Sequence, residues 1–209
     1  MPIIMVASDI FGRTRALERL CRDLGPGTRL IDPYGGKQMA FGDEARAYAC
    51  FTEQTGLTAY TDKVRTRVEA CREPVMLVGF SAGATASWCL ACGKAASNLT
   101  RAVCFYGSRI RDFTDLAPRV RVDCILPESE PGFSIPELAD VLSQKEGVSL
   151  RTTAYAHGFM NPLSKGYDAG GYERYRGWLL EQSRDSPLEH KLKRSKGNRH
   201  DRLDRSRTL

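Results

Sequence analysis

The pentapeptide G-F-S-A-G at residues 79–83 constrains the fold of this chain more than any other feature of its sequence. An apolar run of strand length, 75–80, leads directly into it, and a helical pattern rich in small residues, 82–97, leaves it. A tight turn between a strand and a helix lifts a serine hydroxyl above the sheet, and the two glycines let strand and helix approach closely. The N–H groups at the start of the helix then face the site where negative charge develops. We therefore interpret Ser81 as a candidate nucleophile.

Strand and helix patterns alternate along the chain around this motif, which is typical of an α/β fold with a mostly parallel sheet and helices on both faces. The expected strands are 3–7, 28–31, 75–80, 102–106, 120–126 and 148–155. The expected helices are 14–24, 43–55, 58–71, 82–97, 135–144 and 167–182. No internal repeat or linker interrupts this series, so residues 1–184 are predicted to form one domain.

A serine hydroxyl needs a base to act as a nucleophile, and that base is normally histidine. The chain has three histidines, and two of them, His190 and His200, lie in the polar C-terminal segment. The third, His157, follows the last predicted strand and precedes the final predicted helix, downstream of Ser81. This position favours His157 as the candidate base.

The acid that orients such a histidine lies between the serine and the histidine in chain order. The loop 127–132, which follows the predicted strand 120–126, offers Glu128 and Glu130. Asp123 is a third carboxyl in this region, and we expect it inside the strand. We prefer Glu130 and keep Glu128 as the alternative.

The formal charge of +6 is concentrated at the C-terminus. Residues 185–209 carry eight Lys and Arg against four acids, which supplies +4 and leaves +2 for residues 1–184. The body has no basic stripe, so nucleic-acid binding by the folded domain is not expected. The segment 185–209 is polar and is predicted to be a disordered basic tail, with weak contact to anionic partners as the alternative.

Other sequence features argue against membrane, metal and secretion functions. No apolar run reaches the ~20 residues of a membrane span. The apolar start, residues 1–8, contains no cationic residue and is a better buried strand than a signal peptide, so a cytoplasmic location is expected. The seven cysteines are expected to be reduced residues of the core or of helix faces. Cys89 and Cys92 form a lone C-x-x-C without a second pair, so no metal or cofactor is predicted.

Several segments taken together resemble the dienelactone hydrolase family over roughly residues 3–182. They are S-D-I-F-G at 8–12, V-G-F-S-A-G-A at 78–84, A-V-C-F-Y-G at 102–107, H-G-F-M-N-P at 157–162 and Y-D-A at 167–169. The resemblance implies an α/β-hydrolase fold and a catalytic triad of Ser81, Glu130 and His157, with glutamate where an aspartate is usual. It further implies an oxyanion hole formed by the backbone N–H groups of Ile10 and Ala82. Asp9 falls where the family often has an acid that restrains the resting nucleophile.

Three departures from the family pattern refine this expectation. Serine replaces the cysteine nucleophile of the founding members, and Asn161 stands where an arginine often binds a substrate carboxylate. The chain starts at the strand before the oxyanion loop, so the fold is expected to be truncated at its N-terminal hairpin. We therefore expect hydrolysis of a small carboxylic ester, lactone or thioester through an acyl-enzyme on Ser81. The alternative is a non-catalytic module on the same fold that binds a small molecule or a protein.

Overall fold

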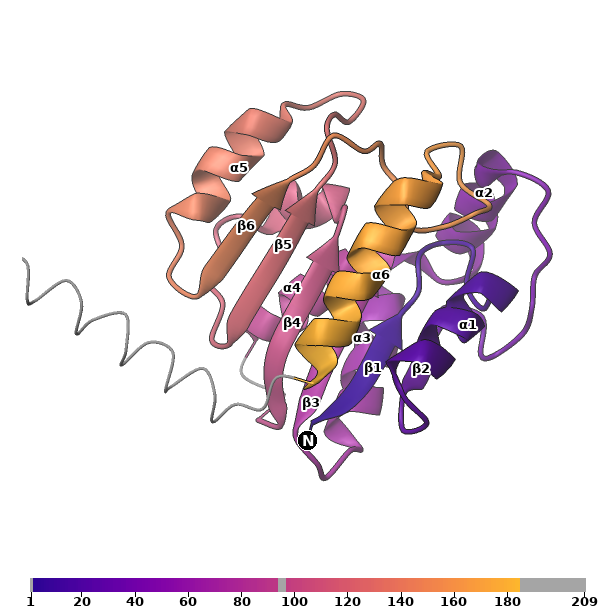
Figure 1. Cartoon of the computed structure of the whole chain (residues 1–209), viewed down its shortest axis with the longest axis horizontal. Coiled ribbons are helices and arrows are strands. Elements are labelled where there is room, and N and C mark those ends of the chain that lie inside the picture. Colours follow the sequence, from indigo (N-terminus) through magenta and orange to yellow (C-terminus); the bar gives the residue numbers. More distant parts are fainter. Residues whose placement is uncertain (1, 94–96, 185–209) are drawn as a thin grey trace, which may run out of the picture.

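The computed structural model describes residues 2–93 and 97–184, so the predicted basic tail lies outside the described residues. Six strands form one sheet in the order β2-β1-β3-β4-β5-β6, and every pair of neighbours is parallel (Figure 1). The strands are β1 (Ile3–Ala7), β2 (Arg29–Ile31), β3 (Val75–Phe80), β4 (Leu99–Phe105), β5 (Arg121–Leu126) and β6 (Val148–Thr152). The predicted α/β class with a parallel sheet is confirmed.

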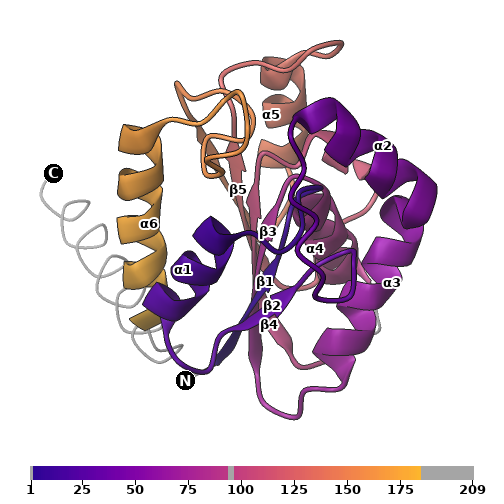
Figure 2. The ribbon, with the colours of Figure 1, turned by 90° about the vertical axis from the view of Figure 1, so that its right-hand side faces the viewer.

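Helices cover both faces of the sheet, as predicted (Figure 2). On one face lie α1 (Arg15–Leu24) and α6 (Ala169–Arg184). On the other lie α2 (Glu44–Gln54), α3 (Gly56–Glu69), α4 (Ala82–Cys92) and α5 (Ile135–Ser143). None of the described helices is long and apolar enough to cross a bilayer.

The alternation of side chains along the central strands builds a core on each face of the sheet. Met5 and Leu77 belong to the core under α3 and α4, whereas Val6 and Val78 belong to the core under α1 and α6. All six residues of β3 are buried. This two-sided burial explains why the strand before the serine motif is apolar throughout.

Three elements have an end that differs from the sequence-based expectation by three residues or more. Helix α4 ends at Cys92, ten residues after Ala82, because the N–H of Gly93 closes it on the carbonyls of Cys89 and Leu90. Strand β4 begins at Leu99, three residues earlier than predicted. The polar residues Thr100 and Arg101 interrupt the apolar pattern, so the pattern indicated a later start.

Strand β6 ends at Thr152 rather than at 155, and the chain then stays hydrogen-bonded to the end of β5 and to the loop after it. The N–H and the Oγ1 of Thr153 both donate to the carbonyl of Leu126 at 3.0 Å, and Glu128 N–H donates to the carbonyl of Tyr155 at 2.8 Å. These bonds lie beyond the last paired residues of β6. They hold together the loops after β5 and β6, which carry the predicted acid and the predicted base.

Candidate active site

The parallel sheet brings the ends of distant strands to one edge (Figure 1). The loops after β1, β3, β4, β5 and β6 all leave from this edge, since the strands run in the same direction. They carry Ile10, Ser81, Ser108, Glu130 and His157, respectively. Residues separated by up to about 150 positions in the chain therefore meet in one place.

Ser81 occupies the sharp turn between β3 and α4 with a backbone φ of 51° and ψ of −110°. A positive φ in a non-glycine residue costs on the order of 1–3 kcal/mol and persists only where the surroundings enforce it. Here the N–H of Ser81 donates to the carbonyl of Phe105 at 3.0 Å, and its carbonyl accepts from the N–H of Thr85 at 3.0 Å. The turn is thus held from both sides, as a nucleophile elbow requires.

The two glycines of the motif are explained by close backbone packing. A Cβ at Gly79 would overlap the carbonyl group of Gly83 and the Oγ of Ser87. A Cβ at Gly83 would overlap the backbone carbonyls of Ala7 and Ser8 at the end of β1. The absence of side chains at both positions therefore lets the first turn of α4 lie directly on the ends of β3 and β1.

Ser81, His157 and Glu130 form a continuous hydrogen-bonded chain. The Nε2 of His157 lies 3.0 Å from the Oγ of Ser81, and the Nδ1 of His157 is hydrogen-bonded to the Oε1 of Glu130. The Glu130 side chain is only 7% exposed, while that of His157 is 31% exposed. A buried carboxylate on one ring nitrogen leaves the other free to accept a proton from the serine, which is the geometry of a triad.

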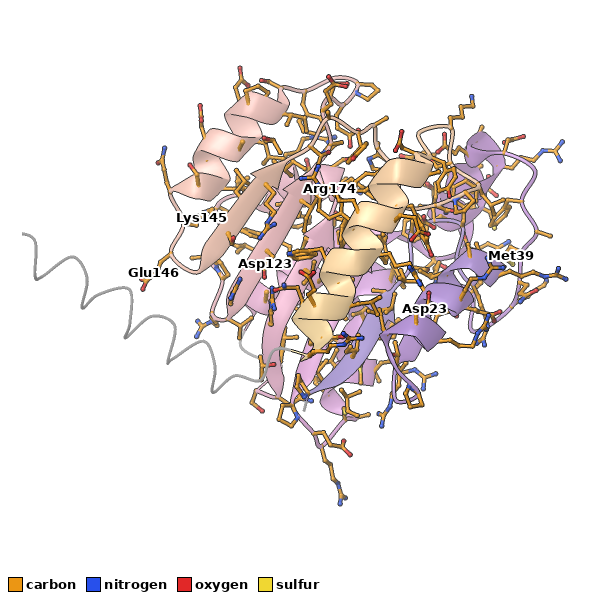
Figure 3. The ribbon with its side chains drawn as sticks, viewed as in Figure 1. Asp23, Met39, Asp123, Lys145, Glu146 and Arg174 are labelled. Carbon is orange, nitrogen blue, oxygen red and sulfur yellow. The ribbon has the colours of Figure 1, made fainter. Side chains whose placement is uncertain are left out.

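The other two carboxyl groups considered from the sequence lie elsewhere. Glu128 is exposed to solvent. Asp123 lies inside β5, as expected, on the body of the sheet (Figure 3). Its buried carboxylate pairs with Arg101 at 2.7 Å and with Arg121 at 3.0 Å. Among these three acids, Glu130 is the one in contact with His157.

The loop after β1 holds the first predicted oxyanion donor, the N–H of Ile10, in a tight turn. The carbonyl of Asp9 accepts from the N–H of Gly12 at 3.1 Å and from the Oγ of Ser8 at 3.0 Å. The hydroxyl of Tyr34 donates to the carbonyl of Ile10 at 2.6 Å. The peptide groups on both sides of Ile10 are therefore fixed.

The second predicted donor is the N–H of Ala82, the first residue of α4. An N–H in the first turn of a helix has no partner within the helix. Neither this group nor the N–H of Ile10 donates to another residue within 2–93 and 97–184. Both groups are thus without an acceptor in the described part of the chain, which the predicted role as oxyanion donors requires.

Asp9 lies in the loop after β1 and is buried, and burial raises the pKa of its carboxyl from 3.8 to about 6. Desolvation is the main cause, and it is partly offset by hydrogen bonds from the Nδ2 of Asn161 at 2.7 Å and the N–H of Phe11 at 2.9 Å. These two bonds, rather than one to Ser81, hold the carboxylate in the described structure. The restraint of the nucleophile that the resemblance implied for Asp9 stays a proposal.

The raised pKa of Asp9 predicts a pH-dependent cost to stability. Between its unfolded pKa of 3.8 and its folded pKa of about 6, the native state binds a proton that the unfolded state has lost. Raising the pH through this window therefore destabilises the wild type, by about 3 kcal/mol at full extent. Asp9→Asn removes this titration, so its unfolding free energy relative to wild type should increase from pH 4 to pH 7.

Urea unfolding of both proteins at several pH values measures this difference. Asp140→Asn removes an exposed carboxyl of α5 and controls for the change in net charge. A difference between Asp9→Asn and wild type that stays constant or falls with pH would contradict the assignment.

Two residues of the site were not singled out by sequence reasoning. Ser108 follows β4 at the start of a 3₁₀ helix, Ser108–Phe113, and its hydroxyl donates to the Oε1 of Glu130. The ring of Tyr106 packs on that of His157 with centroids 5.0 Å apart, and its backbone φ is 39°. The signal that could have found them is the segment F-Y-G-S at the carboxyl end of β4, the strand next to the serine motif.

The described residues contain no group of three or more His, Cys, Asp or Glu side chains that could hold a metal ion. All seven cysteines are free: Cys21, Cys71, Cys104 and Cys124 are buried, and Cys50, Cys89 and Cys92 are partly buried. Burial raises the pKa of the Cys89 thiol to about 11 and that of Cys92 to about 12, which keeps the C-x-x-C pair protonated at neutral pH.

Comparison with known proteins agrees with this geometry. The model of the dienelactone hydrolase family matches residues 1–179. The chain belongs to the dienelactone hydrolase family. Among curated proteins, the chain is similar to the uncharacterized protein YczH of Bacillus subtilis, with 29% identity over 175 residues. That alignment covers 78% of this chain and 83% of YczH.

Solved structures of the family share the fold of this member. A candidate dienelactone hydrolase from Klebsiella pneumoniae superposes with a TM-score of 0.67 at 16% identity, covering 89% of this chain and 88% of that one. A dienelactone hydrolase-like promiscuous phosphotriesterase, P91 from metagenomic libraries, superposes with a TM-score of 0.63 at 19% identity, covering 88% and 85%. The predicted α/β-hydrolase fold is confirmed by these structures, and membership of the dienelactone hydrolase family supports a hydrolase activity for this chain.

Proposed function

We propose that this protein is a serine esterase that cleaves a small carboxylic ester, lactone or thioester through an acyl-enzyme on Ser81. The observation that carries the proposal is the hydrogen-bonded chain from Ser81 through His157 to Glu130. It lies at the strained turn after β3, and the N–H groups of the two predicted oxyanion donors, Ile10 and Ala82, have no acceptor among the described residues. Family membership supports hydrolysis, and the chemistry of these side chains supports an acyl-enzyme.

The proposed first half-reaction forms a covalent bond between Ser81 and the acyl carbon. The Oγ attacks the carbonyl carbon while the Nε2 of His157 accepts the serine proton. The carbonyl oxygen becomes an oxyanion that accepts from the N–H groups of Ile10 and Ala82. Glu130 stabilises the imidazolium through Nδ1. The tetrahedral intermediate then collapses, and the leaving alcohol or thiol takes the proton from Nε2.

The second half-reaction releases the acid. Water attacks the acyl-enzyme and gives a proton to His157, and a second tetrahedral intermediate forms in the same oxyanion hole. Its collapse returns the proton to the Oγ of Ser81 and frees the carboxylic acid. The proposed substrate is small, because the segments around the site are short: 33–43 is a loop, and 107–119 contains one short 3₁₀ helix, so neither forms a large lid. The cytoplasm is the proposed compartment.

Hydrolysis of a series of p-nitrophenyl esters with acyl chains of graded length tests this function. We expect the wild-type protein to release p-nitrophenolate from the short acetyl and butyryl esters and to lose activity on long acyl chains. A protein that hydrolyses none of the esters, yet binds one of their product acids, would support the alternative of a non-catalytic binding module.

A further inference from the structure

The hydroxyl of Ser108 lies between the acid and the base of the proposed triad. It donates to the Oε1 of Glu130, the same oxygen that is hydrogen-bonded to the Nδ1 of His157. The Oγ of Ser108 is also 3.0 Å from that Nδ1. Two donors, one from a side-chain hydroxyl and one from an imidazole, thus converge on a single carboxylate oxygen.

Ser108 is attached to a part of the fold that is fixed by packing. Its N–H donates to the carbonyl of Tyr106 at 3.0 Å, and Ile110, in the same 3₁₀ helix, is fully buried. A Cβ at Gly107 would lie 2.7 Å from the Cδ1 of Ile110 and 3.1 Å from the Cβ of Ala84, so the backbone before Ser108 packs tightly on α4. The hydroxyl therefore projects from a rigid support.

Glu130 has a weaker support of its own. It lies in the loop between β5 and α5, where it forms an isolated bridge with Phe133 across Gly132, whose φ is +82°. A glutamate has one more rotatable bond than an aspartate, so its carboxylate can adopt more orientations for a given backbone position. Without a second partner, only the bond to His157 would select the orientation that the triad needs.

We propose that Ser108 is a positioning residue that holds the Glu130 carboxylate toward His157. This inference rests on the proposed serine hydrolase function. The hydroxyl contacts Glu130 and the Nδ1 of His157 and makes no hydrogen bond to Ser81, so it acts on the reaction through the acid and the base. By donating to Oε1 from a fixed point, it stabilises the one orientation in which this oxygen also accepts from Nδ1. The glutamate thereby works as the acid despite its longer side chain.

Removal of this hydroxyl gives a specific kinetic result. A hydrogen bond to a charged group typically contributes enough to shift an equilibrium about 10- to 100-fold. Ser108→Ala should therefore lower kcat on the best p-nitrophenyl ester by about 10- to 100-fold, with KM changed less than about twofold, since the residue acts in charge stabilisation rather than in substrate binding. Ser108→Thr, which keeps the hydroxyl, should restore most of kcat.

Ser129→Ala is the matched control, because it removes an exposed serine hydroxyl from the loop that carries Glu130. It should leave kcat unchanged. A fall in kcat for Ser108→Ala of less than twofold, or a loss that Ser108→Thr does not restore, would overturn the proposal.

A spectroscopic measurement separates this inference from the proposed function. The proton of Nδ1 in His157 is expected to give a far-downfield resonance in the proton NMR spectrum, because it is donated to a buried carboxylate. Ser108→Ala should shift or broaden this resonance, and Ser129→Ala should not. A shift in a protein without esterase activity would refute the proposed function and retain the positioning role, whereas an unchanged resonance would refute the positioning role.

Discussion

Glu130→Gln should lower the turnover of ester substrates by on the order of 10⁴, with little change in melting temperature. The amide keeps the shape of the glutamate side chain but loses its negative charge. If its NH₂ group faces Nδ1, it favours the tautomer in which Nε2 carries the proton, and His157 then cannot accept the proton of Ser81. A lower turnover at an unchanged melting temperature would show that Glu130 acts on His157 in the reaction rather than in stabilising the fold.

Glu128→Gln is the matched control for this prediction, since it makes the same substitution two residues away on an exposed side chain. A surface substitution typically changes stability by less than about 0.5 kcal/mol, and we expect hydrolysis to remain at the wild-type rate. Turnover is measured as the release of p-nitrophenolate from a short p-nitrophenyl ester. The melting temperature is measured by circular dichroism. If Glu128→Gln lost ester hydrolysis and Glu130→Gln kept it, the acid would be Glu128. If both were active, the triad would need a different third member or none.

Much of the fold was predictable because its local patterns and its packing agree. The continuous apolar strand β3 is buried on both faces, and the serine motif follows it where the close contact of α4 with β1 and β3 demands glycine at 79 and 83. The single histidine in the described body also limited the choice of base. These features are local in sequence, so periodicity and composition could identify them.

The arrangement of the acid and its surroundings was less predictable, because it depends on contacts between distant loops. The sequence favoured Glu130 and kept Glu128 as the alternative. Only the three-dimensional structure shows that Asp123, inside β5 as expected, pairs with Arg101 on the neighbouring strand β4. The bond between Asp9 and Asn161 joins residues 152 positions apart. No local pattern encodes such pairs, since they follow from the order of the strands in the sheet.

Ser81→Ala is the substitution with the largest expected effect on catalysis. It removes the atom that attacks the substrate, so turnover should fall by on the order of 10⁶, and the remaining rate would come from binding and the oxyanion hole alone. The fold should persist, because alanine retains the Cβ of serine and the hydrogen bonds that hold this turn involve only its backbone. Retained ester hydrolysis with an unchanged melting temperature would exclude Ser81 as the nucleophile.

Mass spectrometry of the protein after reaction with a fluorophosphonate probe shows whether Ser81 is a reactive nucleophile. The Oγ of a reactive serine attacks the phosphorus of the probe and displaces fluoride. The serine thereby gains the mass of one phosphonyl group. We expect one adduct per wild-type chain, located on the peptide that contains Ser81, and none on Ser81→Ala. An adduct that persists in the Ser81→Ala protein, or an unmodified wild type, would contradict the account.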